Sequence, residues 1–381
     1  MKRFFLVVSS VVLMALCVPH ITADAANVPD ISAKAAVVIS ADTGEIVYAE
    51  NADAKLPMAS TTKIMTTLLC IESGGLDEEF VVDSDAIRAE GSSMGLQEGD
   101  IVTKYALCCG MLLPSGNDAA NAAAVRIAGS IDAFADMMNE RAQELGMSHT
   151  YFVTPSGLEG EGHGSSAYDM ALLAREALKN DTFRSICSCT DKRVCFGNPP
   201  YNRYLKNTNK LLTMYDGVYG VKTGFTDEAG RCLVSACERN GLDLICVTLN
   251  DRNDWNDHMA LYDYAFQTAK QLTVTAPTNL IADVAGSDKE CVALCTDGEP
   301  INITVVGLNE SDIGFEVISP PFIYAPVMSG DAAAELSISA NGREIRRIPL
   351  YAAENAEYIH KTKKQKRRSA KFTEKLKRLI F

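Results

Sequence analysis

The sequence lacks the features of several common protein classes. It shows no convincing internal repeat, which argues against a repeat architecture. Cys187, Cys189 and Cys195 lie close together, but no second pair stands at the spacing of a zinc site. Charged residues make up only 22% of the chain against 47% hydrophobic residues, so the chain can bury a full core. We expect a folded protein that needs neither a metal nor a cofactor.

Positive charge is also scarce over most of the chain. The formal net charge is −13, although residues 351–381 hold ten Lys and Arg against three Glu. The preceding 350 residues therefore carry 26 basic and 46 acidic groups. An acidic body of this size argues against nucleic acid as a partner.

Only one long apolar run is present, and it lies at the N-terminus. A basic start precedes the apolar residues 4–18, and small residues around Ala23 and Ala25 fit a cleavage site. A membrane anchor is the weaker interpretation, because about 20 apolar residues are needed to span a bilayer. We expect residues 1–25 to be a signal peptide, the protein to be exported, and no second span to follow.

Cysteine is abundant, with twelve residues. Removal of Cys17 with the signal peptide leaves eleven, an odd number that excludes complete pairing within the chain. Four of them lie within apolar stretches and are expected to be small core residues: Cys70, Cys232, Cys237 and Cys246. We infer a compartment that does not force thiols to oxidise.

The pattern of short apolar runs predicts one sheet made from both ends of residues 26–272. Runs at 36–40 and 46–49 flank a Gly-containing turn and predict a hairpin. Further strands are predicted much later in the chain, and helical patterns fill the interval. The expected strands are 217–223, 231–238 and 242–249, and the expected helices are 64–69, 104–113, 118–128, 132–145, 167–179 and 254–270.

The remaining chain has a different texture. Residues 275–350 consist of short β-rich runs separated by Gly, Pro, Asn and Asp, which predicts a small, sandwich-like all-β domain. In the basic tail 351–381, four apolar residues recur at helical spacing, namely Phe372, Leu376, Leu379 and Ile380. This favours an amphipathic helix on an anionic membrane surface, and a disordered, solvated charge run is the alternative.

Three short motifs carry the chemistry. They are S-T-T-K at residues 60–63, S-G-N at 115–117 and K-T-G at 222–224. An S-x-x-K, an S-x-N and a K-T-G in this order are the inventory of the serine acyl-transferases that penicillin inhibits. Each motif alone is weak, and their order and local context make the set specific.

Ser60 and Lys63 supply a nucleophile and a base. A spacing of three places them on one face of a helix, where the Lys63 amine can reach the Ser60 hydroxyl. The amine can accept a proton only if burial and nearby positive charge lower its pKa, and the apolar neighbours suit that. The alternative makes Ser60 a helix cap and Lys63 a solvated residue of the first turn.

The S-G-N and K-T-G motifs each allow a functional and a purely structural interpretation. Pro and Gly around Ser115 define a tight connection that can present Ser115 and Asn117 to a cleft, or simply a loop with a helix cap. K-T-G ends a predicted strand, where Gly224 allows a substrate backbone to approach closely. Lys222 and the Thr223 hydroxyl can bind a terminal carboxylate. The alternative there is a strand end with a turn.

With these three motifs and the stretches around them, the chain resembles the low-molecular-weight penicillin-binding proteins, the D-alanyl-D-alanine carboxypeptidases of the S11 peptidase type. The resemblance is dense over residues 30–270. It extends from the L-P-M-A-S-T-T-K stretch and S-G-N-D-A to the later motifs at 163–170, 207–209 and 220–230. It implies an α/β fold, with a β-lactamase/transpeptidase-like domain (an antiparallel sheet flanked by helices, plus a helical lobe) followed by a small all-β domain.

The resemblance also implies a role for each motif residue. Ser60 attacks the D-Ala-D-Ala peptide bond with Lys63 as general base, and Ser115 relays a proton to the leaving amine. Asn117 holds the substrate backbone. Lys222, Thr223 and Gly224 bind its terminal part, and the backbone N–H groups of Ser60 and Phe225 form the oxyanion hole. The implied substrates are peptidoglycan stem peptides, the implied inhibitors are β-lactams, and the implied place is the extracytoplasmic face of the bacterial membrane or the wall.

Three positions lie outside this pattern. Tyr219 stands where many relatives carry Asp, and we assign it no function. His163 is expected to have a loop or cap role, since no carboxylate partner is identifiable. Arg252 is a weaker candidate for an added carboxylate contact.

Three rival functions remain open on sequence alone. A D,D-endopeptidase acting on cross-linked peptides needs the same residues. A serine β-lactamase needs a deacylating Glu, but Glu159 and Glu161 lack the local pattern of that family. A binding protein with a dead site is disfavoured because all six polar site residues are present.

Overall fold

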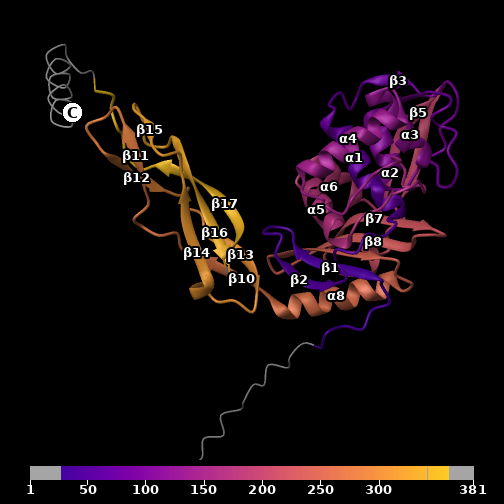
Figure 1. The fold of residues 1–381 in the computed structure, drawn as a ribbon. Coiled ribbons are helices and arrows are strands. Elements are labelled where there is room, and N and C mark those ends of the chain that lie inside the picture. Colours follow the sequence, from indigo (N-terminus) through magenta and orange to yellow (C-terminus); the bar gives the residue numbers. More distant parts are fainter. Residues whose placement is uncertain (1–26, 341, 360–381) are drawn as a thin grey trace, which may run out of the picture.

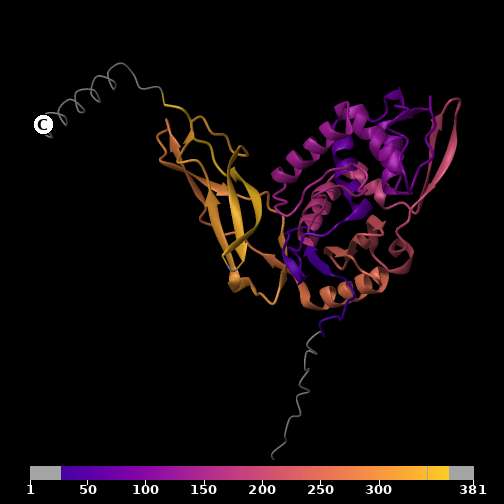
Figure 2. The same cartoon turned by 45° about the vertical axis from the view of Figure 1, so that its right-hand side comes forward.

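The computed structural model describes residues 27–340 and 342–359. Figure 1 shows a helix-rich part resting on a sheet and, apart from it, an elongated β-rich part that begins after α8 (Asp254–Thr268). Figure 2 shows the same separation from a second direction. The predicted signal peptide and all but the start of the predicted tail lie outside the described residues.

The helix-rich part is organised by a five-stranded antiparallel sheet. Its order is β2 (Ile46–Glu50), β1 (Ala35–Ser40), β9 (Leu242–Leu249), β8 (Gly230–Arg239) and β7 (Val218–Thr226). The hairpin β1–β2 therefore pairs with strands from the other end of this part of the chain. The prediction of one sheet from both ends is confirmed.

Strand β9 shows why this sheet is covered on both faces. Successive side chains of a strand point to opposite faces, so a strand buried on both sides is apolar throughout. Leu244 and Cys246 pack in the cluster beneath α8, whereas Ile245 and Val247 pack in the larger cluster of the helical lobe. The sheet is thus the middle layer between α8 and the lobe.

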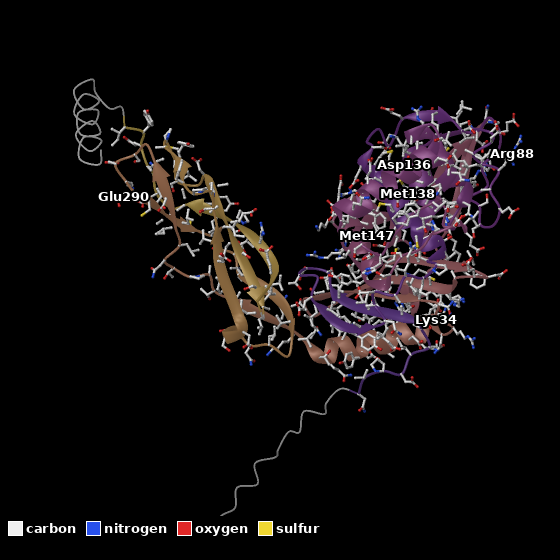
Figure 3. The ribbon with its side chains drawn as sticks, viewed as in Figure 1. Lys34, Arg88, Asp136, Met138, Met147 and Glu290 are labelled. Carbon is white, nitrogen blue, oxygen red and sulfur yellow. The ribbon has the colours of Figure 1, made fainter. Side chains whose placement is uncertain are left out.

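The helical lobe contains the predicted helices and one more. They are α1 (Lys63–Glu72), α2 (Lys104–Leu112), α3 (Asn117–Ala128), α4 (Ile131–Glu144), α5 (Ala167–Leu178) and α6 (Asp181–Cys187). Side-chain caps fix several starts: Ser130 accepts from Ala133 N, and Asn180 accepts from Phe183 N. Met138, buried on the inner face of α4, and Met147 belong to the core of this lobe (Figure 3).

A small four-stranded sheet at the rim of the lobe was not predicted. It orders β3 (Glu79–Val81), β4 (Ile101–Thr103), β5 (Asp191–Gly197) and β6 (Pro200–Lys206). The β5–β6 hairpin is largely exposed and mixes charged and apolar residues, so it has little hydrophobic alternation to read. The helix α6 was also missed, because seven residues are too few to show a clear helical period.

The β-rich part has two sheets. Strand β10 (Ala269–Val274) pairs with β13 (Ile301–Val306). The larger sheet has the order β14 (Ile313–Ile318), β16 (Ala332–Ala340), β17 (Arg343–Ala352), β12 (Cys291–Cys295), β11 (Ile281–Ala285) and β15 (Ile323–Tyr324). Val274 and Ile303 from the first sheet pack in one cluster with Ile338 and Ile345 from the second. The predicted fold class, with an all-β part after the α/β part, is confirmed.

The described cysteines are free thiols, and the four predicted core cysteines are buried. Residues 356–359 stay with the β-rich part, because Ala356 pairs with Val327 and Ile359 N donates to Gly286 O. Within residues 27–340 and 342–359, no helix combines the length and the apolar character needed to cross a membrane.

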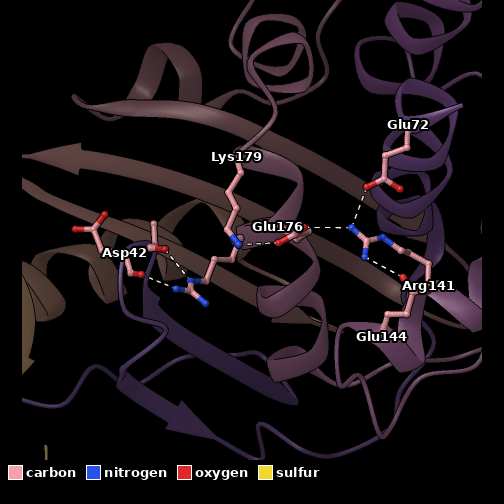
Figure 4. Close-up of polar contacts among 8 residues, drawn as sticks. Asp42, Glu72, Arg141, Glu144, Glu176 and Lys179 are labelled. Carbon is pink, nitrogen blue, oxygen red and sulfur yellow. Dashed lines mark hydrogen bonds and ion pairs between the residues drawn. The ribbon is translucent and has the colours of Figure 1, made fainter. Parts of the chain in front are cut away.

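One charged side chain ties three helices of the lobe together. Arg141 on α4 contacts Glu72 of α1 at 2.9 Å, Glu144 at 3.0 Å and Glu176 of α5 at 3.1 Å (Figure 4). Its side chain is only 21% exposed, so water screens these pairs less than it screens pairs on the open surface. Lys179 adds a more exposed contact to Glu176.

We predict that Arg141→Met lowers the free energy of unfolding by about 1–2 kcal/mol, because three carboxylates then face one another without their shared cation. Lys179→Met removes a single exposed pair and should cost less than about 0.5 kcal/mol. Urea denaturation with an unchanged m-value measures both. Equal effects of the two substitutions would contradict the bridging role of Arg141.

Candidate active site

The nucleophile candidate lies in a short turn before a buried helix. Ser60 belongs to the 3₁₀ turn Ala59–Thr62, and Lys63 is the first residue of α1. Lys63 Nζ donates to Ser60 Oγ at 2.9 Å. Lys63 is fully buried, and Ser60 makes no side-chain cap bond to the helix. The alternative of a helix cap beside a solvated lysine is therefore wrong.

The environment of Lys63 suits a proton acceptor. Besides Ser60, its amine donates to Asn117 Oδ1 at 2.7 Å and to Ser156 O at 2.5 Å. Burial lowers the pKa of Lys63 well below its usual range, and the positive charge of Lys222 lowers it further against the opposing charge of Asp118. In its neutral form the amine can donate its two N–H groups to Asn117 Oδ1 and Ser156 O and accept from the Ser60 hydroxyl with its lone pair, as a general base needs.

Local hydrogen bonds hold the turn in shape. Ala59 has a positive φ of 48°, which is uncommon for a residue with a side chain. Thr61 Oγ1 donates to Met58 O at 2.6 Å, and Thr62 Oγ1 donates to Ala59 O at 2.8 Å. Gly157 passes so close that a Cβ there would overlap Ala59 O. The turn is thus fixed from inside and from the neighbouring loop.

His163 braces the same turn and is not in the cleft. Its Nδ1 accepts from Val153 N at 2.9 Å, and its Nε2 lies 3.0 Å from Thr62 Oγ1. Burial, with the charge of Lys55, lowers the pKa of His163 to about 4. The expected loop role is confirmed. Glu159 lines a small separate cavity with His163.

The S-G-N motif forms the opposite wall. Ser115 is nearly buried in a left-handed conformation with φ 67°, and α3 begins at Asn117. The Asn117 amide is held at both ends, since its Nδ2 donates to Glu90 O at 2.5 Å and its Oδ1 accepts from Lys63. Asn117 therefore fixes the position of Lys63.

Asp118 is a support residue that the sequence reasoning missed. Its buried carboxylate accepts from the backbone N–H groups of Met94, Gly95 and Leu96 at 2.9–3.0 Å. Asp118 thereby holds the loop around residues 94–96 next to the S-G-N motif. A carboxylate with several backbone donors is well satisfied without solvent. The only signal in the sequence that could have indicated this role is the position of Asp118 directly after the S-G-N motif.

The K-T-G motif lies on β7, at the edge of the five-stranded sheet. Lys222 is buried, and Nζ donates to Thr223 O at 2.7 Å. Burial lowers the pKa of Lys222 to about 7. A Cβ on Gly224 would stand 3.0–3.1 Å from Met58 O, Ser60 N and Thr61 N, so only glycine lets β7 approach the nucleophile turn this closely.

A cleft of about 310 Å³ collects residues from all three motifs. It is lined by Ser60, Ser92, Ser115, Thr208, Lys210, Thr223, Gly224, Phe225, Arg231, Asp254 and Trp255. Lys63, Asn117 and Lys222 are buried and reach the site through the contacts above. Arg252 is exposed and does not line the cleft, whereas Arg231, which we did not predict, does.

Tyr219 has a structural setting on β7. Its hydroxyl donates to the Asp243 carboxylate at 2.7 Å, and the Arg184 guanidinium lies 4.1 Å from its ring centre. Burial raises the pKa of Tyr219, and burial raises that of Asp243 to about 6. This cluster does not line the cleft.

The segment Thr208–Asn209 borders the cleft next to β7. Asn209 Nδ2 donates to Gly220 O on β7 at 2.9 Å, and the hydroxyls of Thr208 and Thr223 lie 2.7 Å apart. Thr208 N also donates to Leu113 O, which ties this segment to the end of α2. Thr208 therefore lines the cleft beside Thr223.

Comparison with known proteins agrees with this geometry. The family described as D-alanyl-D-alanine carboxypeptidase, peptidase S11, matches residues 22–253. The chain belongs to this family. The D-alanyl-D-alanine carboxypeptidase DacF of Bacillus subtilis (strain 168) is 35% identical over 337 residues, which cover 85% of each chain.

A solved structure and a second named relative are also similar to this chain. The solved structure of penicillin binding protein 5 from Haemophilus influenzae has a TM-score of 0.67 at 25% identity, with 87% of this chain and 99% of that chain covered. A D-alanyl-D-alanine endopeptidase of Pseudomonas aeruginosa is 30% identical over 223 residues, which cover 57% of this chain and 72% of the relative. The carboxypeptidase DacF thus matches a larger share of this chain than the endopeptidase does.

The partly buried His163 predicts an acid-sensitive fold. Its pKa is about 4 in the folded chain and near 6.5 when unfolded, so the unfolded state binds the extra proton first as pH falls. Stability should therefore be lost between pH 6.5 and 4. His163→Gln keeps a neutral donor and acceptor, and should lose about 2–3 kcal/mol less than the parent between pH 7 and 4. Urea unfolding over this range measures the slopes, and parallel slopes would refute the assignment.

Proposed function

We propose that this S11 protein is a serine-type D-Ala-D-Ala carboxypeptidase that removes the terminal D-Ala from peptidoglycan stem peptides. The observation that carries the proposal is the buried Lys63 amine at 2.9 Å from Ser60 Oγ, beside a cleft on the edge strand β7. An edge strand offers unpaired backbone groups to an extended peptide. The family and the named carboxypeptidase relative support it.

Acylation begins with proton transfer from Ser60 to the neutral Lys63 amine, which activates the hydroxyl as a nucleophile. Ser60 Oγ forms a bond to the carbonyl carbon of the penultimate D-Ala. The oxygen that gains charge is bound by the backbone N–H groups of Ser60 and Phe225. The close fit of Gly224 against Ser60 N keeps these two donors near each other.

The tetrahedral intermediate then collapses with loss of D-Ala. The proton that Lys63 took from Ser60 passes through the Ser115 hydroxyl to the leaving amine, which makes Lys63 neutral again, and Asn117 holds the amide of the retained peptide. The product is an ester on Ser60. Water attacks this ester, gives its proton back through Lys63, and releases the shortened peptide with Ser60 restored.

The position of the Thr208–Asn209 segment favours a carboxypeptidase over an endopeptidase. The terminal carboxylate binds at Lys222 and Thr223, and the Thr208–Asn209 segment is hydrogen-bonded to β7 next to that position. An endopeptidase must let the chain continue past this point.

β-Lactams are the expected inhibitors. Their carboxylate takes the place of the terminal carboxylate, and their ring carbonyl acylates Ser60. A β-lactamase needs a carboxylate to activate deacylating water, but the only acidic residue that lines the described cleft is Asp254, which is bound to Arg231. Slow release of the acyl-enzyme therefore fits this site better than turnover.

We predict that a fluorescent penicillin forms a stable adduct that mass spectrometry maps to Ser60. Ser60→Ala should abolish both the adduct and D-Ala release from a diacyl pentapeptide ending in D-Ala-D-Ala. Lys63→Met should slow acylation by at least about 100-fold, since general-base catalysis contributes that much. Rapid penicillin turnover would support the β-lactamase, and an adduct on another residue would overturn the mechanism.

We also propose that the chain is exported with residues 1–25 as its signal and that the basic tail binds an anionic membrane surface. The proposal rests on the apolar run 4–18 and on the basic, amphipathic pattern of the tail. It places the protein on the extracytoplasmic face of the membrane, next to the wall.

The tail can be tested by truncation after Ile359, which leaves the Ala356 and Ile359 contacts with the β-rich part intact. The full chain should sediment with vesicles containing anionic lipid, and the truncated chain should not. Raised salt should weaken the binding, because the attraction is electrostatic. Equal sedimentation of both chains would contradict the proposed membrane binding by the tail.

A further inference from the structure

The cleft continues beyond the nucleophile to a charged cluster that the mechanism does not use. Arg231 Nη2 lies 2.8 Å from Asp254 Oδ2, and Asp254 Oδ1 accepts from Trp255 N at 2.9 Å. The Arg231 guanidinium is 5.3 Å from the ring centre of Trp255. All three residues line the same cleft as Ser60.

Within this cluster only Arg231 is available to a ligand. The Asp254 side chain is 3% exposed, and both of its oxygens have partners, whereas the Arg231 side chain is 41% exposed. Asp254 and Trp255 therefore hold the guanidinium in place from one side. A guanidinium has five N–H donors in a planar fork, which suits bidentate binding of a carboxylate.

The direction of the substrate places its amino-terminal side at Arg231. In the proposed function Lys222 and Thr223, next to Thr208, receive the terminal carboxylate, so the rest of the peptide runs along β7 toward Phe225. On that side Phe225 of β7 is paired with Arg231 of β8. The residue that precedes D-Ala-D-Ala thus comes within reach of the guanidinium.

We propose that Arg231 determines specificity by binding a carboxylate carried by the residue that precedes D-Ala-D-Ala. This inference rests on the proposed function, because it takes the direction of the peptide from the binding of the terminal carboxylate at Lys222 and Thr223. It names the donor peptide as one with an acidic side chain. A peptide with a neutral amide in that place lacks the ion pair.

The protein provides its own reporter for a binding test. Trp255 is the single tryptophan of the chain and lines the cleft. In Ser60→Ala, which cannot form the acyl-enzyme, its fluorescence is titrated with N-acetyl-Glu-D-Ala-D-Ala and with the Gln peptide of equal shape. A second pair of peptides, in which α-aminopimelate or its side-chain amide replaces Glu or Gln, tests whether a longer side chain is needed to reach the Arg231 guanidinium.

We expect at least one acidic peptide to bind roughly tenfold more tightly than its amide, as for a charge-assisted bidentate pair. Adding Arg231→Gln should bring this ratio close to one, and Arg231→Lys, which keeps the charge without the fork, should give an intermediate ratio. Arg88→Gln is the matched control. Arg88 lies at the outer edge of the helical lobe, with a side chain 71% exposed, and should leave the ratio unchanged (Figure 3).

Two results would overturn the proposal. One is an acidic-to-amide ratio near one for both pairs in Ser60→Ala. The other is an equal loss of acidic and amide peptides in Arg231→Gln, which would assign Arg231 to the terminal carboxylate. The same ratio of kcat/KM with Ser60 present is a second readout. Absence of D-Ala release from every peptide would instead refute the proposed function, whatever the binding ratio.

Discussion

The site depends on the burial of the Lys63 amine, which disfavours its charged form. Lys63 has no carboxylate partner among its hydrogen bonds, only the oxygens of Ser60, Asn117 and Ser156. Burial lowers the pKa of Lys63, and the positive charge of Lys222 lowers it further. The rest of the lobe serves this arrangement. Asp118 holds the loop behind Asn117, and His163 braces the turn that presents Ser60.

The second constraint is closeness between elements that are far apart in the chain. The turn before α1 and the edge strand β7 come within backbone contact at Gly224, and the layered core keeps both rigid. The sheet between α8 and the lobe thus holds Ser60, Ser115 and the K-T-G strand around one cleft.

The sequence predicted the parts whose signal is local. The β1–β2 hairpin, the helices of the lobe other than α6 and the three motifs follow from periodicity and spacing, and Ser60 and Lys63 meet as their spacing requires. The contact between Lys63 and Ser156 could not be predicted in the same way, because Ser156 contributes a backbone carbonyl, which any residue has. Asp118, Thr208 and Arg231 were also missed, because they act through contacts between segments that are distant in the chain. The β5–β6 hairpin, exposed and of mixed composition, gave no periodic signal.

The order of strands in the central sheet has a consequence for how the protein is made. A chain synthesised from its N-terminus releases Ser60 and Lys63 early, together with β1, whose partner β9 ends only at Leu249. Until β7, β8 and β9 have emerged and docked, the turn that holds Ser60 has no opposing strand, and the cleft lacks Thr223, Gly224 and Phe225. Long-range pairing of this kind is slow to form. The cleft is therefore completed only when nearly all of the α/β part has been made.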